Sequence, residues 1–151
     1  MGAPHWEPRA RGTLFGLTRG TGRAHLARAA LEAMAFSTHD VVEAMQGDAG
    51  VRMPELRVDG GAAANDWLMQ FQADVLGVPV RRPALVEMTA RGAAGLAGVA
   101  TGFWSGPEEF AAARPEESVF APAMEGDARA AALAGWQRAV DAACAWATGG
   151  G

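Results

Sequence analysis

The sequence predicts an α/β fold that is rich in helices and has few strands. Apolar residues recur with helical spacing over most of the 151-residue chain. Two short runs inside it, residues 56–58 and 78–81, combine the apolar character and the flanking turn residues of buried strands. Strands that alternate with helices favour α/β, but so few cannot form an independent doubly wound sheet. The length suits a single domain over residues 1–151, which we expect to be part of a larger one.

The first third of the chain is predicted to contain a loop, a short strand and a long helix. Residues 2–12 are too rich in proline, glycine and arginine for regular structure, whereas residues 13–17 suit a short strand. The helix is predicted over residues 23–45, with a stop at Gly47. Its apolar face is predicted to consist of Ala27, Leu31, Met34, Val41 and Met45.

The middle of the chain is predicted to hold two strands and a helix between them. The first strand, residues 56–58, leads into a helix over residues 65–76 with Gly77 after its end. Leu68, Phe71 and Val75 fall on one face of that helix. The second strand, residues 78–81, is closed by Pro83.

Residues 92–100 have helical apolar content but an unusual number of glycines. Gly92, Gly95 and Gly98 each cost about 1 kcal/mol relative to alanine in a helix interior. Because they are spaced three apart, they form one smooth edge that a neighbouring backbone or a ligand could approach.

The last third is predicted to be a connector followed by a helix and a flexible tail. The connector spans residues 105–126 and opens with a short helix that has Ser105 as its cap and Pro107 in its first turn. Asp127 is predicted to cap the final helix, and residues 148–151 form the tail. The buried side of the final helix is predicted to consist of Leu133, Trp136, Val140 and Ala147.

Composition excludes several classes of function. The 13 basic and 17 acidic residues give a net charge of -4, and no basic patch is present to bind nucleic acid. All the basic residues are arginine, which excludes a P-loop lysine and Schiff-base chemistry. A single cysteine, Cys144, excludes a disulfide framework and suits the cytoplasm. We expect no signal peptide and no membrane span, since the longest run of small apolar residues is too short to cross a bilayer.

An apolar strand that runs into two glycines and then a helix is the most informative motif. Residues 56–70 read LRVDGGAAANDWLMQ, in which Gly60 and Gly61 let bare backbone and a helix N-terminus approach a flat or anionic ligand such as a nucleotide. Asp59 ends the strand at the edge where ligands of open α/β sheets bind, and Asn65 offers its amide to a base or ribose. These residues alone leave an ordinary tight turn as the alternative.

A second glycine-containing loop, residues 16–25, precedes the first long helix. The hydroxyls of Thr18 and Thr21 could hold a phosphate, with Arg19 and Arg23 as counter-charges. Its composition favours the simpler interpretation, a helix-initiating loop with solvated arginines.

No catalytic residue and no metal ligand is predicted in this chain. The three histidines, His5, His25 and His39, do not match the spacing of a metal site, and we expect His25 and His39 to be capping or surface residues of a helix. The carboxylates are scattered, and the sequence contains no G-x-S-x-G elbow for an acyl-transfer nucleophile.

Taken together, these segments resemble the carboxyl-terminal lobe of the FGGY carbohydrate kinases. The resemblance covers residues 56–83, 89–104 and 134–146, in register and in order, together with a shorter pattern in the first third of the chain. Within the family it is strongest to the members that phosphorylate glycerol, and it corresponds to about the last third of such an enzyme. The family pattern G-x-L-x-G-L…H-L-x-x-A-x-L-E is matched by Gly12, Leu14, Gly16, Leu17, His25, Leu26, Ala29, Leu31 and Glu32.

The resemblance implies an actin-like, ribonuclease-H-like ATPase fold, with MgATP and substrate between two lobes. It implies that Gly61 and Asn65, with Gly60 beside them, contact the adenine nucleotide. ATP and Mg are therefore the expected cofactors, and glycerol is the expected substrate, bound through an amino-terminal lobe that this chain lacks. The catalytic base and the phosphate loop belong to that lobe, so we expect the chain alone to be inactive. A homo-oligomer stays open.

The chain departs from the family pattern at three positions, and two other functions stay open. Arg91 stands in place of an apolar residue, Gly95 in place of a larger one and His5 in place of a tyrosine. The charge at Arg91 raises the question of how its helix packs. The alternatives to a glycerol kinase lobe are a lobe of a sibling FGGY sugar kinase and a non-catalytic nucleotide-binding remnant.

Overall fold

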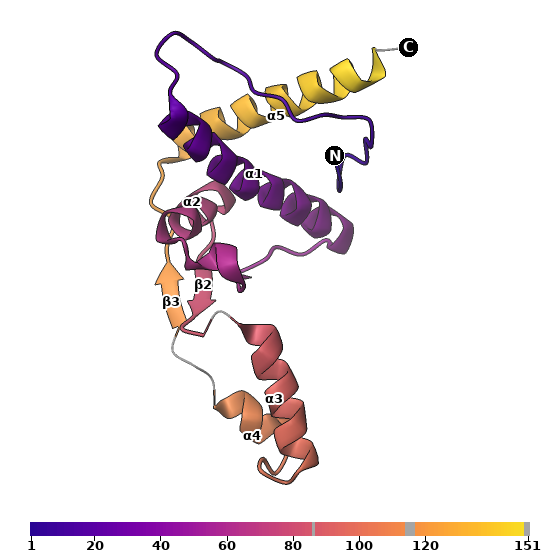
Figure 1. The fold of residues 1–151 in the computed structure, drawn as a ribbon, viewed down its shortest axis with the longest axis vertical. Helices are drawn as coiled ribbons and strands as arrows, with labels where there is room; N and C mark the ends of the chain where they lie inside the picture. Colours follow the sequence, from indigo (N-terminus) through magenta and orange to yellow (C-terminus); the bar gives the residue numbers. More distant parts are fainter. Residues whose placement is uncertain (86, 114–116, 150–151) are drawn as a thin grey trace.

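The computed structural model describes residues 1–85, 87–113 and 117–149. Five α-helices, one short 3₁₀ helix and three strands follow one another along these residues (Figure 1). In chain order they are α1 (Arg23–Ala49), β1 (Leu56–Arg57), η1 (Gly61–Ala64), α2 (Asp66–Leu76), β2 (Val80–Pro83), α3 (Met88–Ala100), α4 (Pro107–Ala112), β3 (Glu117–Phe120) and α5 (Gly126–Thr148). The prediction of a helix-rich α/β fold with few strands is confirmed.

The three strands form one small sheet in the order β1–β2–β3. β1 pairs with β2 in parallel, with Leu56 opposite Val80, and β2 pairs with β3 antiparallel, with Val80 opposite Phe120. β3 was not predicted, because it lies in the segment 105–126 that was expected to be a connector. Only four residues long and exposed at its centre, it shows no apolar run and depends on pairing with β2.

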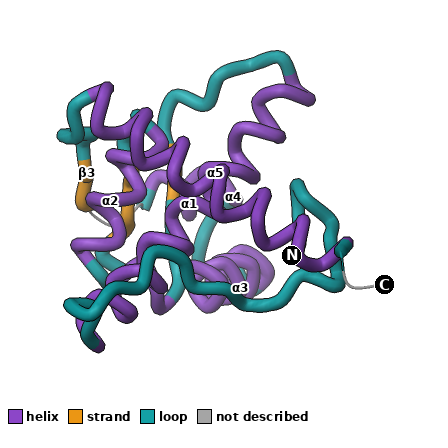
Figure 2. The backbone as a smooth tube through the Cα atoms, turned by 90° about the horizontal axis from the view of Figure 1, so that it is seen from above, coloured by secondary structure: helices purple, strands orange, loops and turns teal. Residues whose placement is uncertain are grey.

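The hydrophobic core lies around α2, which packs on the sheet and against α1 and α5 (Figures 1 and 2). Leu68, Phe71 and Val75 of α2 are buried in it, as predicted, together with Val80 of β2. The predicted side of α5 is also turned inward, since Val140 and Ala147 are buried and Leu133 and Trp136 pack against the core.

The predicted apolar face of α1 is wrong for most of its residues, although Leu31 packs against the core. Ala35, Phe36 and Val42 are its buried residues, whereas Met34 and Met45 are 46% and 63% exposed. The predicted stop at Gly47 is also wrong, since α1 continues to Ala49 and ends at Gly50 in the left-handed conformation. Small and apolar side chains occur on every face of α1 itself. Its packing against α2 and α5 therefore determines which face is buried.

α3 and α4 form a separate excursion that projects from the sheet (Figure 1). The predicted smooth edge of α3 receives aromatic rings: a Cβ atom at Gly95 would lie 2.4 Å from the Phe110 ring, and one at Gly98 would lie 2.5 Å from the Trp104 ring. A Cβ atom at Gly92, in contrast, would meet nothing within 4 Å. Two of the three glycines are therefore required by close packing.

Arg91 joins α3 to α4, which explains how α3 packs with a charged residue at this position. Its guanidinium lies 4.2 Å from the centre of the Phe110 ring and donates hydrogen bonds to the carbonyls of Phe110 and Ala113 at 3.2 and 2.7 Å. These carbonyls lie at the carboxyl end of α4, where a cation is favourable. The cap at the other end of α4 is Gly106 and not Ser105.

The ends of α5 differ from the prediction in one respect. Its N-cap is Glu125, and Asp127 lies inside the first turn, where its charge still complements the helix dipole. Of the predicted tail, Thr148 ends α5 and Gly149 is its C-cap, while residues 150 and 151 lie outside the described residues, as do residues 114–116 of the predicted connector.

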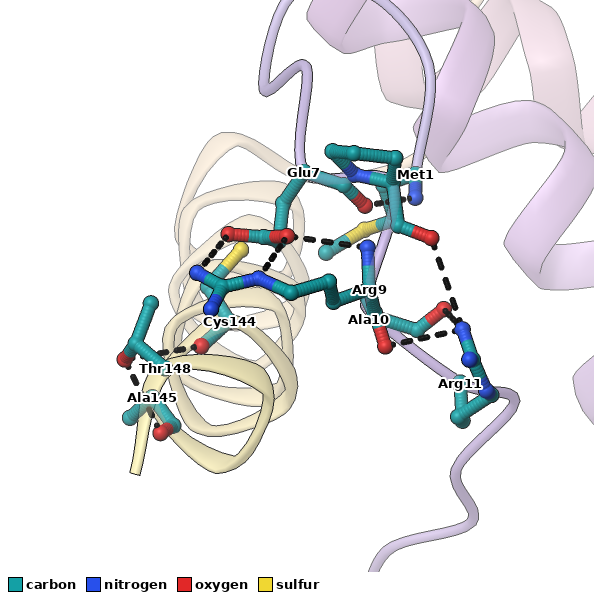
Figure 3. A network of polar contacts seen from close by, with 9 residues as sticks. Met1, Glu7, Arg9, Ala10, Arg11, Cys144, Ala145 and Thr148 are labelled. Atoms are coloured by element: carbon teal, nitrogen blue, oxygen red, sulfur yellow. Dashed lines mark hydrogen bonds and ion pairs between the residues drawn. The ribbon is translucent and has the colours of Figure 1, made fainter. Parts of the chain in front are cut away.

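The first residues of the chain lie along the carboxyl-terminal half of α5 (Figures 1 and 3). Glu7 accepts hydrogen bonds from the backbone and side chain of Arg9, which lowers the pKa of Glu7. Farther in, Asp40 of α1 accepts hydrogen bonds from His5 at 3.1 Å and from the Trp136 indole at 2.7 Å.

The residues predicted as a strand, 13–17, form no ladder with another strand. None of the helices described is long and apolar enough to cross a bilayer.

Candidate nucleotide site

The turn between β1 and α2 has the backbone geometry that the glycine pair predicted. β1 is fixed to β2 by the N–H of Leu56, which donates to Pro79, and the N–H of Val58, which donates to Arg81. Gly60 then adopts φ 82° and ψ 175°, a conformation open essentially to glycine alone. The chain continues into η1, whose first residue is Gly61.

Gly61 stands at an open surface. It is exposed, and a Cβ atom built on it would meet no atom within 4 Å. In the described part of the chain no acceptor contacts the N–H groups of Gly61 and Ala62, as expected for the first residues of a helix. This turn therefore offers a ligand two backbone donors without partners among the described residues, and open space on the Cβ side of Gly61.

The two polar atoms of the Asn65 side chain, Oδ1 and Nδ2, have different roles. Its Oδ1 accepts a hydrogen bond from the N–H of Leu68 at 3.0 Å and so caps α2. Its side chain is exposed, and its Nδ2 has no partner among the residues described. The capping end is therefore committed to the fold while the donor end is free for a ligand.

Arg82 holds this turn in place, a role that was not predicted from the sequence. The guanidinium donates to the carbonyl of Ala63 at 2.8 Å and to Asp66 at 2.7 Å, and it lies 5.1 Å from the centre of the Phe120 ring. One side chain of β2 thus joins η1, the first turn of α2 and β3. Its place between the predicted second strand, residues 78–81, and Pro83 gave no signal of this role, because the contacts join segments distant in sequence.

Asp59 lies apart from the glycine turn. It lines a cavity of about 530 Å³ between the sheet and the α3–α4 excursion, whose other polar walls include Arg57, Arg81 and Arg91. Gly60, Gly61 and Asn65 do not line this cavity. The structure therefore keeps three of the predicted residues together at one turn and directs the fourth to a neighbouring hollow.

The charges along this cavity neutralise one another. Glu55 pairs with Arg81 and with Arg57, and Glu117 pairs with the same two arginines. The hydrogen bond from Arg81 is the main cause that lowers the pKa of Glu55, and the same bond raises the pKa of Arg81. Because each of these two arginines already has carboxylate partners, the cavity has little positive charge left for a phosphate.

The polar groups of the second predicted candidate, residues 16–25, also already have partners within the protein. The N–H of Thr18 donates to the Thr21 hydroxyl at 2.9 Å, and the N–H of Gly20 donates to the Thr18 hydroxyl at 3.3 Å. The N–H of Gly22 donates to Nδ1 of His25 at 3.1 Å, which makes His25 a capping residue. The polar groups of the loop bond to one another at the start of α1. This favours a helix-initiating loop over a phosphate site.

The other histidines lie beside Asp40. His5 and His39 approach the two carboxylate oxygens of Asp40 at 3.1 and 3.6 Å. Among the described residues no group of three or more histidine, cysteine or acidic side chains is placed to hold a metal ion.

Comparison with known proteins identifies the fold around this turn. Residues 1–101 match the FGGY family of carbohydrate kinases, C-terminal domain. The chain belongs to this family. The glycine turn, residues 60–65, therefore lies in the carboxyl-terminal domain of an FGGY kinase.

Individual relatives agree with the family match. Glycerol kinase of Dechloromonas aromatica is 59% identical over 147 residues, covering 97% of this chain and 29% of the relative. The crystal structure of Plasmodium falciparum glycerol kinase with ADP superposes with a TM-score of 0.80 and 32% identity, over 93% of this chain and 28% of that one. Xylulose kinase from Rhodospirillum rubrum superposes with a TM-score of 0.74 and 26% identity, over 94% and 29%.

These matches define how much of a kinase is present. The chain spans less than a third of the length of the relatives that it matches. The prediction of an FGGY kinase fold, similar to the carboxyl-terminal lobe of glycerol kinase, is confirmed.

Proposed function

We propose that this chain is the adenine-nucleotide-binding carboxyl-terminal lobe of a glycerol kinase. The observation that carries the proposal is the open turn at Gly61 and Asn65, in a chain 59% identical to a glycerol kinase over almost its whole length. The structure of a glycerol kinase with ADP, on which this chain superposes, supports a nucleotide as the ligand.

Gly60, Gly61 and Asn65 would hold the nucleotide. The missing side chain at Gly61 gives a flat base or a ribose room to approach the backbone, and the unpaired N–H groups of Gly61 and Ala62 donate hydrogen bonds to it. The free Nδ2 of Asn65 adds a third donor, while its Oδ1 keeps α2 capped. Gly60 sets the direction of the chain through its positive φ angle.

The bound MgATP would supply the γ-phosphoryl group that is transferred to glycerol to give glycerol 3-phosphate. Catalysis of phosphoryl transfer rests mainly on positioning and charge neutralisation. This chain's residues contribute the positioning of the adenosine end. The catalytic base and the magnesium-binding groups would come from the remainder of the kinase, so the isolated chain is expected to be inactive.

Glycerol is proposed over a sugar on the strength of the similarity. In structural superposition the identity is 32% to the Plasmodium falciparum glycerol kinase and 26% to the Rhodospirillum rubrum xylulose kinase, and in sequence comparison it reaches 59% to the Dechloromonas aromatica glycerol kinase. The net charge of -4 and the single cysteine agree with a cytoplasmic enzyme that does not bind nucleic acid.

The test measures binding and turnover separately. ADP binding to the purified chain is measured by titration calorimetry, and MgATP-dependent glycerol phosphorylation is measured with the chain alone and mixed with the amino-terminal part of Dechloromonas aromatica glycerol kinase. We expect ADP binding by the chain and glycerol phosphorylation only in the mixture. Phosphorylation of xylulose or gluconate in preference to glycerol would assign the lobe to a sibling kinase. ADP binding without turnover in the mixture would favour a non-catalytic remnant.

A further inference from the structure

The donors of the candidate nucleotide site belong to a turn that cannot fix its own direction. η1 is a 3₁₀ helix of four residues, and its ends are closed by backbone hydrogen bonds of 3.1 Å, from Ala63 to Gly60, and 3.2 Å, from Asn65 to Ala62. A helix this short gains little from its own bonds, whose geometry is poorer than in an α-helix. The direction of its free N–H groups therefore depends on the contacts that hold η1 from outside.

Arg82 provides such a contact from the neighbouring strand. Its Nη1 donates to the carbonyl of Ala63 at 2.8 Å and to Asp66 at 2.7 Å, so one nitrogen is bonded on both sides of Asn65 along the chain. The guanidinium is itself held in place, because Cζ lies 5.1 Å from the centre of the Phe120 ring and the side chain is only 16% exposed. A fixed group on the sheet thus brackets the residue that offers Nδ2 to a ligand.

The two bonds of Arg82 differ in how well water can replace them. The Asp66 side chain is 76% exposed, and an exposed ion pair contributes little because water and salt screen it. Ala63 is 2% exposed, and its carbonyl accepts a charge-assisted hydrogen bond, which is stronger than a neutral one. A buried carbonyl is also costly to leave without a donor. The bond to Ala63 is therefore the one that holds the turn.

We propose that Arg82 is a positioning residue that sets nucleotide affinity through the carbonyl of Ala63. This carbonyl belongs to the same turn as the free donors of Gly61, Ala62 and Asn65, so a shift of the carbonyl redirects all of them. Hydrogen bonds weaken steeply as their angle departs from linearity, so a small rotation of the turn lowers affinity. The inference rests on the proposed function in that the ligand is the adenosine end of a nucleotide.

The test compares Arg82→Met with Arg81→Met by calorimetric titration of the chain with ADP. Methionine keeps an unbranched stem beside Phe120 but cannot donate a hydrogen bond. Arg81 is the matched control, because it is the adjacent arginine of β2, pairs with Glu55 and Glu117, and lines the cavity on the other face of the sheet. We expect Arg82→Met to weaken ADP binding by about tenfold and Arg81→Met by less than about twofold. Equal affinities of the two variants would overturn the proposal.

A second ligand separates positioning from electrostatic attraction. Adenosine has no phosphate, so the charge of Arg82 cannot attract it over a distance as it could attract ADP. Positioning by the turn predicts a loss of about tenfold for adenosine as well as for ADP, because the turn meets the adenosine end. A loss with ADP and none with adenosine would show that Arg82 acts on the phosphates and would overturn the proposal.

Two further variants identify which bond of Arg82 is responsible. Arg82→Lys keeps a cation and a donor on a long stem, so it should weaken ADP binding by only about threefold, and it carries the comparison if Arg82→Met does not fold. Asp66→Asn removes the ion pair but leaves the bond to Ala63, so affinity should change by less than about twofold. A larger loss with Asp66→Asn than with Arg82→Lys would overturn the role of the Ala63 carbonyl.

Amide hydrogen exchange shows where in the chain the effect arises. We expect the amides of Ala63 and Asn65 to exchange about tenfold faster in Arg82→Met, with the buried amides of α2 unchanged. Faster exchange throughout the chain would show a global loss of stability and overturn a local positioning role. Absence of ADP binding by the unaltered chain would contradict the proposed function and the inference together. ADP binding that Arg82→Met leaves intact would overturn the inference alone.

Discussion

Two glycine-containing loops lead into helices in this molecule, and they differ in what they leave free. In residues 16–25, backbone N–H groups donate hydrogen bonds to the threonine hydroxyls and the histidine ring of the same loop, at the start of α1. Residues 60–65 leave the N–H groups of Gly61 and Ala62 and the Nδ2 of Asn65 without partners in the described part of the chain. Glycine content alone therefore does not identify a ligand site. The proposed nucleotide site differs from the other loop in its unpaired hydrogen-bond donors and the open space at Gly61.

The largest expected effect tests which loop meets the nucleotide. Gly61→Trp should weaken ADP binding by about 100-fold or more, because the indole fills the open space that the ligand needs. Gly20→Trp is the matched change in the other loop and should leave binding unchanged. Calorimetric titration of both variants with ADP checks this, and equal losses would erase the difference between the loops.

Backbone conformation within the open loop gives the next effect. Gly60→Ala should destabilise the chain by about 1–3 kcal/mol, because φ 82° with ψ 175° strains any residue with a Cβ atom. Gly61→Ala should be close to neutral, since its added methyl group meets no atom within 4 Å. Urea denaturation followed by circular dichroism measures both. A stable Gly60→Ala variant would contradict the conformation assigned to this turn.

The two roles of Asn65 can be separated from each other. Asn65→Asp keeps an N-cap acceptor for Leu68 and should keep stability, yet it removes the Nδ2 donor and should weaken ADP binding by about tenfold. Thr21→Val in the closed loop should do the opposite, with a loss of about 1 kcal/mol in stability and unchanged ADP binding. Parallel denaturation and titration experiments are needed, and a loss of both properties in either variant would break the contrast.

The smallest effect concerns the ion pairs beside the open loop. The folded state lowers the pKa of Glu55, chiefly through Arg81, so this group stabilises the fold above the ordinary glutamate pKa of about 4.3 and less as the pH falls through its lowered value. Glu55→Gln should therefore reduce the loss of stability between neutral and acid pH. Denaturation midpoints measured from pH 7 to pH 3 check this, with Glu43→Gln as the exposed control.

Local sequence signals predicted the parts of the fold that local chemistry determines. The positions of β1 and β2, the extent of α2 and the turn at Gly60 follow from apolar runs, Gly77 and the glycine pair. β3 escaped because a four-residue strand exists only through pairing with β2. The buried face of α1 was mistaken because apolar residues lie all around it, so tertiary packing decides.

The candidate site divides in the same way. The grouping of Gly60, Gly61 and Asn65 follows from their closeness in sequence, and their contact with a nucleotide stays a prediction. The separation of Asp59 into a neighbouring cavity and the role of Arg82 depend on contacts between distant segments. No single-sequence signal reports such contacts.

Asp40 has a consequence for how the molecule opens. One carboxylate joins His5, near the start of the chain, to Trp136 in the last helix, 96 positions farther along than Asp40 itself. The start of the chain and the last helix therefore share one hydrogen-bond acceptor, in addition to the packing of α5 on the core. We expect the first residues and α5 to unfold as one cooperative unit, which makes the termini the least independent parts of the chain despite lying farthest apart along it.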